Sequence, residues 1–334
     1  MWNKIVKFFK KYDALLVILI GVLLIIYLFK KLIAAVIENV NATTCFLLFQ
    51  KITNGLVKYG WSRQIWFRCL HGMEAGMKTR FRFTKTGSIK FIGHLDCMRF
   101  FQKALRRAKM DVAYSQGFNP HQIMSFASPL SVGLTSDGEY IDIEFVSLPS
   151  EDPNEIVNYL NTCMTDELFV TEMKVLPDKS KTSMALLHAC DYMITVKKED
   201  RFWKNMENEG GGAAGEFSLP EMFEAFMQQP QIIILKKTKK SEKEMDIKPY
   251  IQQYAFTRET FEEKTGEALP ELHNEFDSED CLFLQLTSGS SINIKPEHVL
   301  QAFEHYVQAQ FRPYSYQIHR LQMYFMDEEG AASE

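Results

Sequence analysis

The sequence predicts an α+β protein made of two consecutive units of sheet and helix, and three observations support this. Segments with apolar residues at every second position, typical of half-buried strands, alternate with segments whose apolar spacing is typical of amphipathic helices. The order β-α-β-β-α-β occurs between residues 77 and 180, and a comparable order follows between residues 185 and 327. With 334 residues, 46% of them hydrophobic, the chain can form two buried cores.

The first element is a strand over residues 79–85. Phe81 and Phe83 alternate there with Arg80 and Arg82. A period of two predicts one apolar face and one basic face.

A basic amphipathic helix is predicted next, over residues 93–110. Its apolar residues fall in one arc at about 100° per residue, and its basic residues fall in the opposite arc. The basic arc contains Arg99, Lys103, Arg106 and Arg107. Asp96 near the start complements the positive end of the helix dipole.

The rest of the first unit follows the same logic. Strands are predicted at residues 110–115, 138–146 and 168–177. A helix is predicted at residues 152–164, because Asp152 can cap it and Pro153 suits its first position.

The second unit repeats this plan less clearly. Strands are predicted at residues 190–198, 231–240, 281–288 and 314–325. One helix begins after Ser218 and another covers residues 295–307, while residues 242–272 stay ambiguous. The β-α-β-β-α-β order is that of a ferredoxin-like sandwich, so we expect two tandem ferredoxin-like domains, at 77–180 and 185–327, and an acidic tail at 328–334.

The first 76 residues differ from the rest. Residues 14–29 carry no charge, and a second apolar stretch, 32–37, follows Lys30 and Lys31. If these two lysines snorkel to the interface, the pattern predicts a hydrophobic, membrane-spanning helix over 14–37. Two alternatives are a signal peptide and an extension that is not native, since Met73 and Met77 are also possible starts. We expect a cytoplasmic protein, anchored to a membrane if residues 1–76 are native.

Positive charge is concentrated in one part of a chain whose formal net charge is -4. Residues 77–110 contain ten basic residues and one acidic residue, Asp96. This asymmetry is typical of surfaces that bind phosphate backbones or acidic partners. The alternative interpretation is a solvated helix face.

A polar loop over residues 114–133 connects two predicted strands and is longer than a tight hairpin needs. We expect a groove near the start of the helix, lined by His94, Asp96, Gln116, Gly117, Phe118, Asn119 and His121. Phe118 beside cationic residues could stack a base. His94 or His121 could act as a general base, although a histidine at a helix entrance is more often a hydrogen-bonding residue.

The six cysteines, at positions 45, 69, 97, 163, 190 and 281, are widely spaced. Their spacing predicts neither a disulfide framework nor a cradle for an iron-sulfur cluster. The eight histidines lack the spacing of a zinc protease helix, so no metal site is predicted.

Residues 80–145 resemble the radical-SAM-linked domain of unknown function, notably in "FIGHLD", "ALRRA", "YSQGFNPH" and "PLSVG". The resemblance extends over about residues 78–325. It implies a radical-SAM partner protein, and any iron-sulfur cluster, S-adenosylmethionine or cobalamin is expected in that partner rather than in this chain. The resemblance carries no established reaction and transfers no catalytic residue.

We therefore expect a non-catalytic recognition or accessory subunit that binds RNA or another polyanion. Its predicted contact residues are Arg80, Arg82, Arg99, Lys103, Arg106 and Arg107. One alternative is an enzyme that cleaves or modifies RNA with His94 or His121. A second alternative is a scaffold that binds only protein.

Overall fold

The computed structural model of the protein describes residues 76–177, 179–196, 218–237, 242–273, 276, 280–308 and 315–326. Contacts divide the chain into two units, Met1–Glu74 and Ala75–Glu334, and all described residues belong to the second. The predicted helix 14–37 and the tail 328–334 lie outside the described residues. In the described part of the chain, no helix is both long enough and apolar enough to cross a membrane.

The first half has the predicted β-α-β-β-α-β order, except that a further short strand at 124–126 lies within the segment predicted as the loop 114–133. The elements are β1 (Met77–Lys85), α4 (His94–Arg107), β2 (Asp111–Val112), β3 (Met124–Phe126), β4 (Thr135–Ser147), α5 (Pro153–Asn161) and β5 (Val170–Val175). β1 lies between β5 and β4, while β2 and β3 both pair with β4. All these pairs are antiparallel.

The second half repeats this strand order with insertions. Its elements are α6 (Ser183–Leu186), β6 (Leu187–Val196), α7 (Leu219–Met227), β7 (Ile233–Lys237), β8 (Glu242–Asp246), β9 (Ile251–Ala255), α8 (Arg258–Thr265), β10 (Cys281–Thr287), α9 (Pro296–Tyr306) and β11 (Tyr316–Phe325). β6 lies between β11 and β10, and β9 pairs with the other side of β10.

The ambiguous residues 242–272 therefore contain two strands and a helix. One expectation about the second half needs correction: the strand predicted at 231–240 does not join the main sheet. It forms β7, which pairs with β8 in a separate two-stranded sheet. Ile233 and Leu235, on the same face of β7, are both about half exposed, so this hairpin is not a buried central strand.

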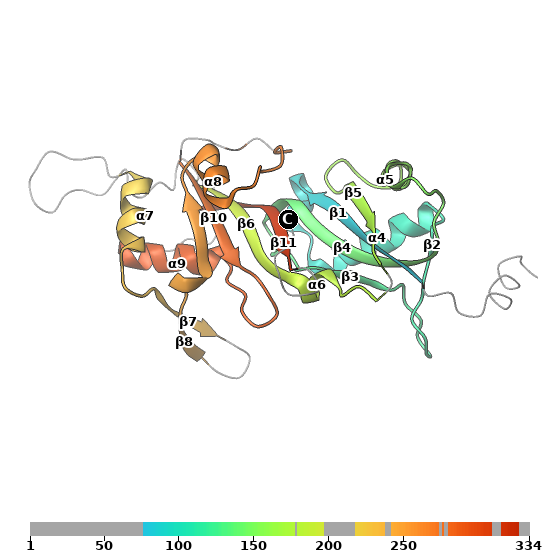
Figure 1. The fold of residues 1–334 in the computed structure, drawn as a ribbon, viewed down its shortest axis with the longest axis horizontal. Coiled ribbons are helices and arrows are strands. Elements are labelled where there is room, and N and C mark those ends of the chain that lie inside the picture. Colours follow the sequence, from blue (N-terminus) through green and yellow to red (C-terminus); the bar gives the residue numbers. More distant parts are fainter. Residues whose placement is uncertain are drawn as a thin grey trace, which may run out of the picture. The chain divides into compact units, whose positions relative to one another are not determined.

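One continuous sheet joins the halves, because β11 of the second half pairs in parallel with the start of β4. Figure 1 shows β1, β4, β11, β6 and β10 following one another across the sheet. The pairing is short, with His319 opposite Thr135 and Arg320 opposite Ser136. Gly138 is needed beside it, since a Cβ there would collide with the Leu321 carbonyl.

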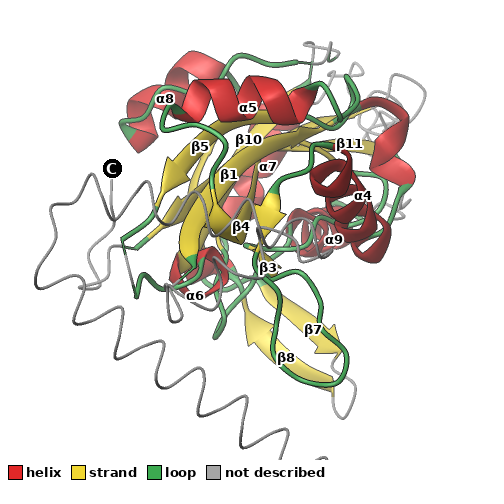
Figure 2. Ribbon diagram, turned by 90° about the vertical axis from the view of Figure 1, so that its right-hand side faces the viewer, coloured by secondary structure: helices red, strands yellow, loops and turns green. Residues whose placement is uncertain are grey.

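Each half has its own core on the helical side of its strands. In the first, Phe83 of β1 packs edge-on against Phe101 of α4, with 4.9 Å between ring centroids. In the second, Phe226 of α7 packs against Phe303 of α9 at 5.5 Å. Burying each such ring contributes about 1.5–3 kcal/mol. Figure 2 shows the helices against the strand layer.

Candidate nucleic-acid interface

Helix α4 carries the predicted basic arc on its exposed side. Its buried side chains are Cys97, Phe101, Ala104 and Leu105, which face the apolar side of β1. The opposite side carries four exposed cations, Arg99, Lys103, Arg106 and Arg107. Arg106 and Arg107 lie in the last turn, where positive charge complements the helix dipole.

Two of these cations have partners in the structure. Arg99 Nη1 lies 3.0 Å from Asp96 Oδ1, and Arg107 Nη2 donates to the Cys163 carbonyl oxygen at 2.5 Å. Lys103 and Arg106 have neither an ion pair nor a hydrogen bond from their side chains to any described residue. The α4 basic face, defined as these four cations, therefore keeps a net positive charge that a ligand can use.

The prediction that Arg80 and Arg82 share this surface is wrong. Phe81 and Phe83 pack under α4, so the alternating Arg80 and Arg82 lie on the opposite face of the sheet. Two amphipathic elements that pack through their apolar sides must direct their polar sides apart. Arg80 and Arg82 instead line a crevice with residues of β5 and β11.

Most of the first part of the predicted loop 114–133 forms a protruding hairpin. We call this hairpin the ribbon and define it as residues 113–123. Its two arms are joined by backbone hydrogen bonds, from Ile123 to Ala113 at 2.9 Å and from Ser115 to His121 at 2.8 Å. In Figure 1 the ribbon extends away from the sheet after β2.

The tip of the ribbon consists of exposed residues. Gln116, Gly117, Phe118 and Asn119 are all exposed, and the Phe118 ring is fully exposed. Gly117 has φ 117°, a conformation that favours glycine over residues with a side chain. An apolar ring held clear of the body in this way is free to contact a partner.

The two candidate histidines have separate partners. His94, at the start of α4, packs edge-on against Phe126 at 5.0 Å between ring centroids. His121 Nδ1 lies 2.8 Å from Ser115 Oγ within the ribbon. These contacts do not link the two imidazoles. The structure therefore does not support the expected groove lined by both histidines. No group of three or more histidine, cysteine or acidic side chains in the described residues is placed to hold a metal ion.

A buried polar seam between the halves was not found from the sequence. The carboxylate of Asp137, on β4, forms hydrogen bonds with two histidines. Its Oδ2 lies 3.0 Å from His319 Nε2, and its Oδ1 lies 3.1 Å from His273 Nδ1. His319 Nδ1 lies 2.8 Å from Thr135 Oγ1. Burial raises the pKa of Asp137, but the hydrogen bonds and charges of the two histidines outweigh burial and lower it overall.

A second ion pair lies beside it. Arg320 Nη1 contacts both carboxylate oxygens of Glu139, at 2.9 and 3.2 Å, and both side chains are buried. Lys85 is also buried, and desolvation lowers its pKa. These groups are enclosed, so they hold the halves together rather than present a surface. The sequence signal was the presence of Asp137 and Glu139 near the start of β4.

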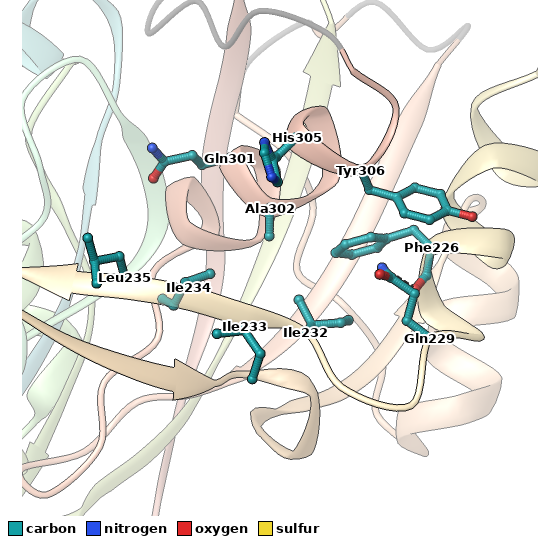
Figure 3. A pocket seen from close by; sticks show the side chains of 10 residues that line it. All are labelled: Phe226, Gln229, Ile232, Ile233, Ile234, Leu235, Gln301, Ala302, His305 and Tyr306. Atoms are coloured by element: carbon teal, nitrogen blue, oxygen red, sulfur yellow. Dashed lines mark hydrogen bonds between the residues drawn. The ribbon is translucent and has the colours of Figure 1, made fainter.

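A larger hollow lies in the second half, between β7 and α9, with a volume of about 570 Å³ (Figure 3). Ala302 of α9 and Ile234 of β7 line it from opposite sides. The remaining lining residues are Phe226, Gln229, Ile232, Ile233, Leu235, Gln301, His305 and Tyr306. No lysine, arginine or acidic side chain of the described residues lines it, so the hollow does not suit a polyanion.

Comparison with known proteins identifies the family. The model of the family described as "Uncharacterized protein conserved in bacteria (DUF2344)" matches residues 78–296. The chain belongs to this family. The DUF2344 match starts in β1 and ends at the first residue of α9, so it includes α4, the ribbon and most of the second half. The start agrees with the expected 78–325, while the end falls short of it.

Other comparisons add little to the DUF2344 assignment. No curated protein matches the chain. One solved structure, titled "Crystal Structure of an Unknown Protein from Galdieria sulphuraria", is 11% identical, with a TM-score of 0.19. The alignment covers 73% of this chain and 97% of that chain. A likeness this weak supports no statement about fold or function.

Proposed function

We propose that the described unit is a recognition module that binds RNA, or another polyanion, through the α4 basic face. The observation that carries this proposal is the group of four exposed cations on one side of a helix whose other side is buried. From Arg99 to Arg107 the face extends about 12 Å along the helix axis. A row of cations of this length suits a phosphate backbone, whose charges are closely spaced.

The ribbon is the second part of the proposal. Phe118 would stack on an unpaired base while the α4 basic face holds the backbone. The exposed ring supports this role, because an apolar side chain in full contact with water gains from being covered by a partner.

We also infer that the halves are tandem ferredoxin-like domains. The support is the repeated strand order: β5-β1-β4 with β2 and β3 in the first half, and β11-β6-β10-β9 in the second. In each half the first strand lies between the last strand and the third, and the second strand pairs with the third. This arrangement is that of a split β-α-β unit.

The radical-SAM partner remains part of the proposal and rests on the resemblance of residues 80–145. Under it, the module would present a nucleic acid to an enzyme whose cluster and cofactor lie in a separate polypeptide. Isolation of the protein from bacterial cells, with bound proteins identified by mass spectrometry, tests this part. Recovery of a radical-SAM protein supports the proposal, and consistent recovery of other partners contradicts it.

RNA binding is tested by measuring the affinity for a fluorescent single-stranded RNA at several salt concentrations. The double variant Lys103→Ala/Arg106→Ala removes the two cations of α4 whose side chains contact no partner among the described residues. For single strands, each phosphate contact contributes about −0.7 to the slope of log affinity against log salt. Loss of two contacts should therefore make the slope less steep by about 1.4. The variant Lys179→Ala/Lys243→Ala, which removes two exposed cations elsewhere, should bind as the unchanged protein does.

Two outcomes would contradict RNA recognition by α4. One is equal affinity of both double variants and the unchanged protein. The other is the absence of salt-dependent RNA binding together with binding to an acidic protein, which would favour the scaffold.

An RNA-cleaving enzyme is a second candidate, favoured by one observation. The Ser115 hydroxyl and the His121 imidazole lie 2.8 Å apart on the exposed ribbon, a contact that can move a proton. Cleavage of the bound RNA that is lost in both Ser115→Ala and His121→Ala would support this candidate. Binding without cleavage would support recognition alone.

A further inference from the structure

A crevice lies on the sheet face opposite α4, at the end of β11. Its volume is about 300 Å³, at the lower end of the range for small-molecule pockets. Its lining residues come from three strands of the first half and from the second half: Arg80, Arg82, Tyr140, Glu172, Lys174, Leu176, Glu267, Gln322, Met323, Tyr324 and Phe325. It is separated from the α4 basic face by the sheet and the first core.

Arg80 is fixed in this crevice by groups of the protein itself. Its Nε donates to Asp142 Oδ1 at 2.8 Å, and its Nη2 donates to Asp142 Oδ2 at 3.3 Å. The guanidinium carbon also lies 4.8 Å from the centre of the Phe325 ring. The Asp142 carboxylate therefore balances the charge of Arg80, and these contacts fix the position of its guanidinium at the side of the crevice.

Arg82 differs, because its side chain forms no ion pair or hydrogen bond with any residue that the structure describes. Its Nε is buried and has no hydrogen-bond partner in the described part of the chain. Glu172 lies opposite Arg82 in the pairing of β1 with β5, but its carboxylate contacts Lys174 Nζ at 3.7 Å instead. The Nη atoms of Arg82 are not among the buried atoms that lack a partner, so they are the part of the guanidinium that an anionic ligand could contact.

The other lining groups limit the charge of such a ligand. Tyr140 lies opposite Arg82 on β4, and its hydroxyl donates to Gln322 Oε1 at 3.2 Å. Glu172 and Glu267 are both exposed and line the same crevice. These carboxylates repel a ligand with several negative charges, so a ligand with a single charge fits best.

We propose that this crevice binds a small organic monocarboxylate, whose carboxylate pairs with the Arg82 guanidinium. The planar, forked guanidinium matches two carboxylate oxygens. An apolar or aromatic body fits against Tyr140 and Phe325, whose rings lie 5.0 Å apart. The site is separate from the proposed RNA interface, because Arg82 and the α4 basic face lie on opposite sides of the main sheet.

The test is a titration of the full chain with sodium benzoate, followed by calorimetry or by protein NMR shifts. Saturable binding is expected, and Arg82→Gln should weaken it at least tenfold. Lys243→Gln, which changes an exposed cation on the separate β7-β8 hairpin, is the control and should not change it. Phenyl phosphate, a ligand of similar size with up to two charges, should bind more weakly than benzoate.

A second variant keeps the test decisive if Arg82→Gln does not fold. Glu172→Gln changes an exposed side chain and removes one repelling carboxylate, so it should strengthen benzoate binding several-fold. Saturable benzoate binding that responds to both changes in these directions supports the site. Absence of saturable binding, an unchanged affinity in both variants, or tighter binding of phenyl phosphate overturns it.

Discussion

His319 Nε2 and Asp137 Oδ2 lie 3.0 Å apart although 182 residues separate them in the chain. His319 is on β11 and Asp137 is on β4, so the contact crosses the seam where the two halves share one sheet. Both side chains are buried. The DUF2344 fold is thus joined by a polar contact as well as by strand pairing.

Replacing Asp137 with alanine should strongly destabilise the protein. The change removes the acceptor of both histidines and leaves the buried Nε2 of His319 without a partner, while His273 is exposed and can bond to water. The expected loss is about 3 kcal/mol or more in the free energy of unfolding, measured by urea denaturation. Glu151→Ala, an exposed acidic residue, is the control and should change stability by less than about 0.5 kcal/mol. Equal stability of both variants would show that the seam contact is dispensable.

The stability of the protein should decrease between about pH 4 and pH 7 through Asp191. Burial raises the pKa of this carboxyl to about 7, although the Tyr324 hydroxyl donates to it at 2.6 Å. Because the folded state holds the proton more tightly than the unfolded state, the stabilisation is complete below the unfolded pKa and is lost as the pH rises to about 7.

Asp191→Asn should remove this dependence, since the amide resembles the protonated carboxyl. The free energy of unfolding of the variant minus that of the unchanged protein should therefore be larger at pH 8 than at pH 5. At about 1.4 kcal/mol per unit, the two pH units between pH 5 and the pKa of about 7 give a difference of roughly 3 kcal/mol as an upper limit. Denaturant unfolding at both pH values measures it. A constant difference between the two proteins would refute the assignment.

Phe118→Ala should weaken RNA binding without changing stability. The ring is fully exposed at the ribbon tip, so its removal costs no core packing. Loss of one stacked base is expected to cost about 1–3 kcal/mol in binding, measured with the same fluorescent RNA. Phe118→Trp keeps an aromatic ring and should retain affinity. If alanine binds as tightly as phenylalanine, the ribbon takes no part in recognition.

Cys97 should resist alkylation in the folded protein. It lies on the buried side of α4, and burial, followed by the nearby Glu139 charge, raises its pKa to about 12. A thiol reagent acts on the thiolate, so at pH 8 iodoacetamide should modify Cys97 only after denaturation. Peptide mass spectrometry before and after urea treatment measures the difference. Rapid modification of the native protein would show that α4 separates from the sheet.

The first half was predictable because its signals are local. Alternation in β1 and the helical spacing in α4 each involve a few neighbouring residues, and both elements formed where they were expected. The exposed side of α4 was predictable for the same reason. The error was to combine the basic sides of β1 and α4, although packing of Phe83 against Phe101 requires those sides to point apart.

The seam was not predictable because it depends on distant residues. Asp137 and Glu139 resemble the polar positions of any half-exposed strand, and only the arrival of β11 buries them beside His319 and Arg320. The β7-β8 hairpin was missed for another reason. An apolar run such as residues 232–235 reads equally well as a central strand or as the wall of a groove.

The position of β11 has a consequence for biosynthesis. It is the last described strand in the chain, yet it lies between β4 and β6 in the sheet. On a translating ribosome, the two half-sheets would emerge before the strand that couples them. Closure would wait until residues 316–325 leave the exit tunnel, and a nascent chain stalled earlier would expose the edges of β4 and β6 to chaperones.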